Sequence, residues 1–506
     1  MRKNILITFL LILSLFSNSQ TTFNKTFTPC LNNPNTAYNA SSILSDGSGY
    51  IISGTAYDTI NINYPSLFFY KVDSIGNISK ITSFTRYGWN YYYNISSLIE
   101  LKHGGYCYIG DMDTAINNPI HLIIRFDANM DTLWTKIIPN DIFFWEALCQ
   151  VKETSDGGFI FVGAKEVSLN NLGAYLVKTD SLGNILWTKT IAIPDGCGAS
   201  RIIETQDKGF LLKGFRQTYT LGDGDPFILK TDSLGNQQWI KYLGGNQYDG
   251  SAAFALTKDS NIIVALGYAT FTYPDNADFE GRLNVIKYSL TGTVIWNKMY
   301  DTIKTFLNIG KIQVLPNNDF IVMGINALPT QGNNFSFFPS FYFKFNSNGD
   351  SLWRKMYYFK NDYGDKNILA DNVLNTEGGI TACGWVESNS QVPYQQIWLL
   401  KTDSMGYAPG PQNVGVIDLP YLQLSYGVLK LYPNPATTTI MLSITTALKQ
   451  GEVSIYNMLG IKVMETQLSK AQNAFQLDIS QLAKGYYKVI LSDYGYIKGE
   501  ASLLKE

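Results

Sequence analysis

The sequence predicts an all-β protein whose larger part is built from repeated four-stranded units. One stretch, KTDSLGNILWTK at 178–189, recurs as KTDSLGNQQWIK at 230–241. Weaker copies follow at successive spacings of 52 to 57 residues, which is typical of stacked supersecondary units. Aligned on one position, the copies begin at Asp73, Asp127, Asp180, Asp232, Ser289, Asn346 and Asp403. Aromatic residues make up 14% of the 506 residues and glycine is abundant, a composition that favours short strands joined by tight turns.

The stretch at 178–189 predicts the end of one strand, a tight turn and the start of the next strand. Asp180 can accept hydrogen bonds from the backbone two residues on, and Gly183 can take the positive φ that a short hairpin loop requires. Asp232 and Gly235 repeat this arrangement. A tryptophan recurs seven residues after the aligned position, at Trp134, Trp187, Trp239, Trp296 and Trp353. We expect these side chains to pack between neighbouring sheets.

A second recurring element lies upstream of each copy. At 154–164 a turn leads into an apolar strand that ends near a glycine, and the pattern returns in every repeat. A complete unit therefore contains a strand, an Asp-Gly turn, a second strand, a variable loop, a third strand, the Asp-Ser-Leu-Gly-Asn turn and a fourth strand. Four short antiparallel strands form one blade of a β-propeller, so seven units predict a seven-bladed propeller over residues 20–406.

The two ends of the repeat region predict how the ring closes. The seventh unit runs after Tyr407 into a proline-rich segment that cannot form a fourth strand. The segment at 21–27, TTFNKTF, resembles the missing strand, with Phe23 in the tryptophan position and Lys25 in the lysine position. We therefore expect the N-terminal strand to complete the last blade. The first unit departs from the pattern because Lys80 stands where tryptophan is expected.

The chain ends predict an exported protein with a second, smaller domain. Residues 1–19 combine Arg2 and Lys3 with an apolar run at 5–16, which is typical of a signal peptide and shorter than the roughly 20 residues of a membrane span. Residues 407–426 are rich in proline and glycine and predict a linker. Residues 427–506 alternate apolar and polar side chains and predict a small β-sandwich.

This last segment resembles the type A C-terminal sorting domain of the type IX secretion system. Four ordered blocks carry the resemblance: YPNP at 432–435, IYNMLG at 455–460, LDIS at 477–480 with GYY at 485–487, and the terminal strand at 498–505. The matching motif residues include Pro433, Asn434, Pro435, Gly460, Gly485, Tyr487 and Lys498. The resemblance implies that the secretion machinery recognises this domain, carries the cargo across the outer membrane, and leaves it secreted or attached at the cell surface. The repeat region resembles the propellers often found in such cargo.

Composition and motifs argue against several classes of function. A net charge of −2 gives no electrostatic footprint for nucleic acid. Serine hydrolase, zinc protease and nucleotide-binding motifs are absent from the sequence, and we expect no metal and no cofactor. His103 and His121 occupy repeat positions and are expected to be structural. Of the five cysteines, Cys107 and Cys383 are predicted to be small core residues on strands.

Two functional hypotheses follow. The first is a non-enzymatic binding module for a glycan or a surface protein, which uses aromatic and acidic residues of the connections between units. Its candidate ligand-binding residues are Trp89, Tyr91, Trp145, Tyr248, Asp249 and Tyr363. The alternative is a polysaccharide-active enzyme with carboxylates converging in the propeller funnel. Its candidates are Glu146, Asp249 and Asp371, expected near the start of first strands, although the same residues can simply cap turns and face solvent.

Overall fold

The structure is a computed structural model. All regular secondary structure in its described residues is β-strand. These are residues 22–27, 36–58, 66–84, 89–92, 98–114, 118–138, 146–168, 171–218, 223–244, 249, 251–269, 281–301, 306–329, 335–359, 365–387, 395–408, 416–418, 429–443, 451–457, 462–468, 474–493 and 496–506. The chain divides into two compact units, Met1–Leu419 and Pro420–Glu506. The predicted signal peptide lies outside the described residues. The all-β class is confirmed.

The strands of the first unit form successive antiparallel sets, and each set is one blade. The first strands are β2 (Thr36–Ser45), β7 (Leu98–Glu100), β11 (Glu146–Glu153), β15 (Gly196–Glu204), β19 (Ala252–Leu256), β23 (Phe306–Val314) and β28 (Lys366–Leu374). The second strands are β3 (Gly49–Asp58), β8 (Tyr106–Thr114), β12 (Phe159–Ser168), β16 (Phe210–Thr218), β20 (Ile262–Ala269), β24 (Phe320–Pro329) and β29 (Ile380–Glu387).

The remaining strands complete these blades. The third strands are β4 (Ser66–Asp73), β9 (Asn118–Phe126), β13 (Asn171–Thr179), β17 (Asp223–Thr231), β21 (Gly281–Tyr288), β26 (Ser340–Phe345) and β30 (Gln395–Lys401). The fourth strands are β5 (Ile78–Phe84), β10 (Thr132–Ile138), β14 (Ile185–Ile191), β18 (Gln237–Tyr242), β22 (Val294–Asp301), β27 (Ser351–Tyr357) and β1 (Phe23–Phe27). Three short strands are added: β6 (Trp89–Tyr92) pairs with β8, β25 (Phe335–Phe337) with β24, and β31 (Val416–Asp418) with β27.

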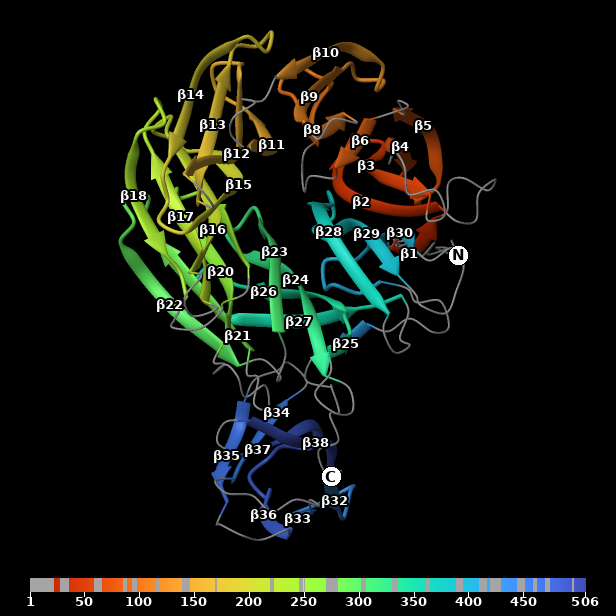
Figure 1. Cartoon of the computed structure of the whole chain (residues 1–506). Helices are drawn as coiled ribbons and strands as arrows, with labels where there is room; N and C mark the ends of the chain where they lie inside the picture. Colours follow the sequence, from red (N-terminus) through yellow and green to blue (C-terminus); the bar gives the residue numbers. More distant parts are fainter. Residues whose placement is uncertain are drawn as a thin grey trace, which may run out of the picture. The chain divides into compact units, whose positions relative to one another are not determined.

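The blades follow one another in a ring, and the last lies beside the first (Figure 1). The N-terminal strand β1 pairs antiparallel with β30, with Phe23 opposite Lys401 and Phe27 opposite Ile397. The predicted closure by the N-terminal strand is therefore observed. Phe23 is 4% exposed and packs in one core with residues of β2, β3, β4, β29 and β30. A chain end far in sequence from β30 thus completes the seventh blade.

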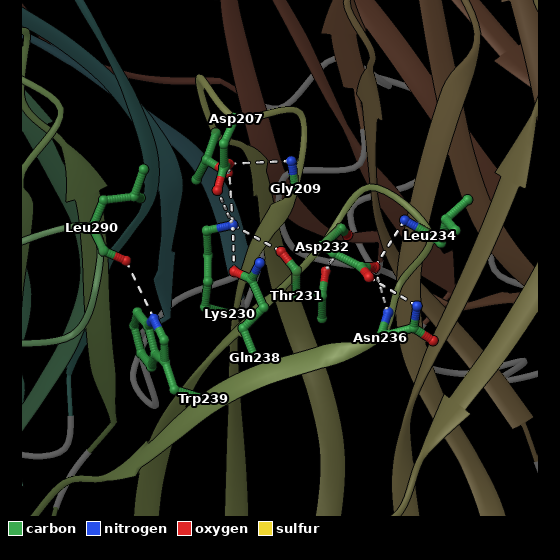
Figure 2. Close-up of polar contacts among 11 residues, drawn as sticks. Asp207, Gly209, Lys230, Thr231, Asp232, Leu234, Asn236, Gln238, Trp239 and Leu290 are labelled. Carbon is green, nitrogen blue, oxygen red and sulfur yellow. Dashed lines mark hydrogen bonds and ion pairs between the residues drawn. The ribbon is translucent and has the colours of Figure 1, made fainter.

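Each recurring turn has the chemistry that the sequence predicts. In Figure 2, Asp232 accepts hydrogen bonds from the backbone N–H groups of Leu234 (2.9 Å) and Asn236 (2.8 Å). Asp180 does the same for Leu182 and Asn184. Gly183 and Gly235 both adopt φ of 77°, in the left-handed region that glycine tolerates best. These contacts fix the turn so that the fourth strand leaves in one register.

The fourth strand of one blade packs on the turn of the next blade. Trp187 lies against Gly235, and Trp134 lies against Gly183. The tryptophan of β18 also donates a hydrogen bond from Nε1 to the carbonyl oxygen of Leu290 in the following blade (3.2 Å; Figure 2). At the point of closure Phe23 and Lys25 lie against Gly76, so Phe23 takes the tryptophan position as predicted. The tryptophans therefore have the structural role expected of them.

Lysines of the fourth strands add polar contacts to the same interface. Lys136 donates to Asn184 Oδ1 (2.9 Å) and Lys189 to Asn236 Oδ1 (2.6 Å), in both cases reaching the turn of the next blade. Lys80, which stands where tryptophan is expected, donates to the carbonyl oxygen of Asn129 and to Asp131 Oδ1 (2.9 Å). The first blade therefore contacts the second through an ion pair instead of an indole.

The second unit contains two sheets that share one apolar core. One sheet has the order β32 (Lys430–Tyr432), β33 (Thr439–Ser443), β36 (Ala474–Asp478). The other has the order β35 (Lys462–Gln467), β34 (Gly451–Asn457), β37 (Gly485–Asp493), β38 (Tyr496–Lys505). Ile440, Leu442, Ile455, Val489 and Leu503 are buried in the common core.

Closure of the ring by β1 gives a stability prediction. Replacing Phe23 by alanine empties a buried site between the seventh and first blades, and we expect a loss of about 3–5 kcal/mol in the free energy of unfolding. Urea denaturation of the mature chain measures it. Leu186→Ala is the control, because Leu186 is 59% exposed on β14 and its loss should change stability by less than about 0.5 kcal/mol. Equal stability of the two variants would contradict the closure.

Candidate functional site

The first strands of the blades surround a cavity of about 390 Å³. Its lining comes from six first strands or the turns that follow them: Ile43, Leu44, Leu98, Ile99, Glu100, Lys102, Gln150, Lys152, Glu153, Arg201, Lys311, Asp371 and Val373. Except for Leu98, which opens the three-residue β7, these residues belong to the second half of a first strand or to the turn after it. The cavity therefore lies toward the ends of the first strands, whereas the predicted binding loops precede the first strands.

A recurring backbone irregularity positions four of the polar lining residues. Gln150, Arg201, Lys311 and Asp371 each follow directly on a β-bulge in the pairing of the first with the second strand. A bulge re-aims the side chains that follow it. All four residues lie four positions before the residue that opens the next turn, so they form one row around the ring. We call these residues the inner row.

Three side chains of the inner row also connect neighbouring blades, and Lys311 does so by donating to Asp371 Oδ1 and to the carbonyl oxygen of Asn372 (both 2.6 Å). Gln150 Oε1 accepts the backbone N–H of Ile202 in the next blade (2.8 Å). Asp371 Oδ2 accepts the N–H of Ile43 (3.1 Å), which joins the seventh blade to the first. Asp371 on a first strand and Phe23 on a fourth strand therefore both join the seventh blade to the first.

Asp371 is a buried carboxylate with four hydrogen-bond donors. Besides the N–H of Ile43, its oxygens accept from Ser42 Oγ (3.2 Å), Lys311 Nζ (2.6 Å) and the N–H of Asn372 (2.9 Å). Burial alone would raise the pKa of Asp371, but the Lys311 ammonium outweighs it, and the pKa lies below its usual value. Asp371 is therefore a fixed anion that holds Lys311 in place.

The other cations of the cavity lack such a partner. No hydrogen bond or ion pair to Lys152 or Arg201 is found within the described part of the chain. Burial, followed by repulsion from Lys311 and Arg201, lowers the pKa of Lys152 to about 8. Burial also lowers the pKa of Arg201. The cavity therefore carries two cations that Asp371 attracts from a distance but to which no carboxylate of the described residues is hydrogen-bonded.

Lys213 extends this positive region. It lies opposite Arg201 in the pairing of β15 with β16. Burial first, and Arg201 next, lower its pKa to about 7. At the end of the first strands the charges are mixed, since Glu153 accepts the N–H of Lys102 (2.8 Å). The mouth of the cavity is therefore less positive than its middle.

The structure describes only part of the predicted binding loops. Trp145, Tyr248 and Tyr363 lie outside the described residues. Trp89 and Tyr91 are on β6, whose backbone pairs with β8, and Glu146 opens β11. Asp249 is fully buried beside Gly244, where Asp225 also lies, and Asp225 is paired with Arg216 (2.7 Å). The structure therefore brings Asp249 together with Asp225 and away from the cavity.

Two expectations about carboxylates are wrong. Asp371 lies in the second half of β28, not near its start, and both Asp249 and Asp371 are buried instead of facing solvent. Asp371 is buried by contacts with the first blade, and Asp249 is buried in the connection beside Gly244. Neither contact can be seen from the sequence of a single repeat unit. Other assignments hold: Cys107 and Cys383 are buried and unbridged, and His121 is buried on β9.

The inner row was missed in the sequence because its residues differ from blade to blade. A usable signal exists nevertheless: in four blades a polar or charged residue stands four positions before the turn, as Gln150, Arg201, Lys311 and Asp371 show, whereas the fifth blade has Ala253 there. Within the described residues no group of three or more His, Cys, Asp or Glu side chains is arranged to hold a metal ion. No helix of the described residues is long and apolar enough to cross a membrane.

The second unit is organised around Asn434 of the YPNP block. Its amide donates to the carbonyl oxygen of Ser502 (2.7 Å) and its oxygen accepts the N–H of Leu504 (2.9 Å), so it fixes the last strand β38. Tyr487 is buried and donates to the carbonyl oxygen of Ala483 (2.8 Å). Residues 430–498 match the family described as the secretion system C-terminal sorting domain.

The sorting domain marks this chain as secreted cargo, and it indicates export followed by secretion or attachment at the cell surface. It also implies an interaction with the type IX secretion machinery. Of the other motif residues, Pro433 and Pro435 flank Asn434 and Gly485 opens β37. Lys498 is on β38, and Gly460 lies outside the described residues.

Comparison with solved structures finds distant similarity to other proteins. A protein of unknown function from Dyadobacter fermentans is 9% identical, with a TM-score of 0.41, over 62% of this chain and 95% of that chain. An α-L-arabinofuranosidase from Fusarium graminearum is 11% identical, with a TM-score of 0.39, over 76% and 97%. The Pan2 WD40 domain of Neurospora crassa is 10% identical, with a TM-score of 0.40, over 73% and 91%. No curated protein matches the sequence. These similarities are too distant to bear on activity.

The unpaired Lys152 gives a pH prediction. Its pKa of about 8 lies below the 10.5 of an ordinary lysine, so protonation favours the unfolded state, and this cost is present at pH 7 and disappears above pH 10.5. We expect Lys152→Met to be more stable than wild type at pH 7, with the gain shrinking between pH 8 and 10.5. Urea denaturation across this range measures it, with exposed Lys258→Met as control. A loss of stability at pH 7 would show that Lys152 has a stabilising partner.

Proposed function

We propose that this chain is a secreted protein whose propeller is a non-catalytic binding module. Its ligand binds in the cavity that the first strands surround, which we call the axial cavity. The observation that carries the proposal is the cavity of about 390 Å³, lined by polar side chains that several blades hold in fixed positions. Volumes of about 300–1,000 Å³ are typical of small-molecule sites. A ligand could pack on Leu44 and Val373 while the inner row supplies charges and hydrogen bonds.

The state of Asp371 and Glu153, two of the three carboxylates of the lining, favours binding over catalysis. A general acid needs a raised pKa, and a general base needs an oxygen that can reach the substrate. Asp371 accepts four hydrogen bonds and its pKa is lowered, so it is poorly suited to either role. Glu153 at the mouth is already bound to the N–H of Lys102.

The alternative remains a polysaccharide-active enzyme. Outside the cavity, its candidate carboxylates are the pair Asp225 and Asp249 beside Gly244, and Glu146. Asp249 is fully buried, and Asp225 is 6% exposed and bonded to Arg216, so a polymer could not reach this pair without rearrangement. The predicted binding residues on the connections between units, Trp89, Tyr91, Trp145, Tyr248 and Tyr363, which we call the predicted rim, are a second candidate ligand site for the binding module.

A tryptophan placed at the mouth of the cavity tests the ligand seat. Glycan-array and surface-protein capture with the mature full chain should identify ligands of the wild type. Leu44→Trp, which adds volume to the lining without changing charge, should abolish capture of these ligands, because they would no longer fit. Leu186→Trp on the exposed side of β14 is the matched control and should bind like wild type.

Two outcomes would overturn the proposal. Unchanged ligand binding by Leu44→Trp would show that the ligand binds at another surface, such as the predicted rim. Release of new reducing ends from a captured polysaccharide by the wild type would establish the enzymatic alternative. The melting temperature of each variant shows whether it has folded.

For export, we propose that residues 1–19 direct passage across the inner membrane and the sorting domain passage across the outer membrane. Deletion of 429–506 should leave the propeller in the periplasm, because the signal read by the secretion machinery is lost. Immunoblots of periplasm, cell surface and medium measure the distribution. Exposed Lys484→Ala is the control and should not change export. Normal appearance of the truncated protein outside the cell would contradict the assignment.

A further inference from the structure

The axial cavity holds more positive charge than the protein itself neutralises. Its lining contains four cations, Lys102, Lys152, Arg201 and Lys311, and three carboxylates, Glu100, Glu153 and Asp371, of which Asp371 is bonded to Lys311. Lys152 and Arg201 come from the third and fourth blades, and no ion pair to either is found among the described residues. Half-buried charges without a partner are costly, so such an arrangement is favoured when an opposite charge arrives from outside.

The carboxylates of the lining, Glu100, Glu153 and Asp371, are one fewer than its cations, and no ion pair joins any of them to Lys152 or Arg201 among the described residues. Asp371 is engaged by four donors, two of them from the first blade. Glu153 is held at the mouth by the backbone of Lys102. A hydroxyl of a neutral ligand could accept a hydrogen bond from Arg201, but it would not relieve the repulsion among Lys152, Arg201 and Lys311.

The uncharged residues of the lining indicate what kind of molecule would bring a negative charge into the cavity. Leu44 and Val373 present apolar surface, and Gln150 adds an amide whose oxygen is bonded to Ile202. No partner of Gln150 Nε2 is found among the described residues, so this N–H group is available to a hydroxyl. Apolar side chains with amide donors suit a saccharide ring, which has apolar CH faces and polar hydroxyls.

We propose that the axial cavity binds an acidic saccharide, with Arg201 and Lys152 holding its carboxylate or sulfate group. Arg201 can form a bidentate contact with either group, and Lys152 adds a point charge. Asp371 acts indirectly, because it positions Lys311 at the edge of the same site. The inference rests on the proposed function, since it assigns a ligand class to the proposed seat.

Calorimetric titration of the mature full chain tests this inference with four probes. Trigalacturonate carries carboxylates and its methyl ester is neutral; a sulfated galactan oligosaccharide and its desulfated form are the second pair. We expect one or both acidic probes to bind at least about tenfold more tightly than the neutral counterpart, because hydrogen bonds to charged groups are the stronger ones. The acidic probe that binds identifies the charged group.

Variants of the cations separate a charge effect from a structural one. Arg201→Gln and Lys152→Gln should each weaken binding of the acidic probe about tenfold, whereas Arg201→Lys should restore part of the affinity. Lys258→Gln, which removes an exposed cation outside the cavity, should leave affinity unchanged. The melting temperatures of Arg201→Gln and Lys152→Gln should not fall, since neither side chain has a partner to lose.

The outcomes distinguish this inference from the proposed function. Equal binding of acidic and neutral probes, insensitive to Arg201→Gln but abolished by Leu44→Trp, would overturn the acidic ligand and leave the cavity as the seat. Binding of acidic probes unchanged by Leu44→Trp would overturn both. Binding of inorganic sulfate as tight as that of the sulfated oligosaccharide would overturn the saccharide. Failure of both acidic probes to bind would also overturn the inference.

Discussion

The contact between the fourth strand of each blade and the turn of the next supports the rest of the propeller. A large flat side chain such as Trp187 needs a surface without a Cβ to pack on, and Gly235 offers one. The same glycine is required by the positive φ of the turn, so one residue satisfies both the backbone and the interface. The contact is repeated from blade to blade around the ring. At the point of closure, the N-terminal strand makes the same contact, with Phe23 against Gly76.

The fixed outer contacts determine what happens at the axis. With the blades held at a constant distance, the bulged first strands bring Gln150, Arg201, Lys311 and Asp371 to one level. Gln150, Lys311 and Asp371 use polar atoms to join neighbouring blades, which leaves Arg201, together with Lys152, facing the cavity. The ring is thus both the scaffold and the reason that the cations lie close together. Burial lowers the pKa of both cations, and repulsion from Lys311 and Arg201 lowers that of Lys152 further.

The repeats allowed much of the architecture to be predicted from the sequence. Asp180 and Gly183 predicted the turn, Trp187 its packing, and Phe23 with Lys25 the closing strand, because each of these features is local or recurs at a fixed offset. The sorting domain was recognisable because its blocks follow in order, and Asn434 explains one of them physically. The burial of Asp371 was not predictable in the same way, because it depends on Ser42 and Ile43, more than 300 residues away along the chain. The cations of the cavity come from separate blades, and no sequence motif joins them.

The most direct measurement of the central claim is a crystal structure of the mature chain with an acidic oligosaccharide bound. The account predicts electron density for the ligand in the axial cavity, with its carboxylate or sulfate oxygens within hydrogen-bond distance of the Arg201 guanidinium and the Lys152 ammonium. Density on the loops that carry Trp145 and Tyr363, with the cavity holding only water, would contradict it. That result would assign recognition to the connections that precede the first strands and leave the cations with a purely structural role.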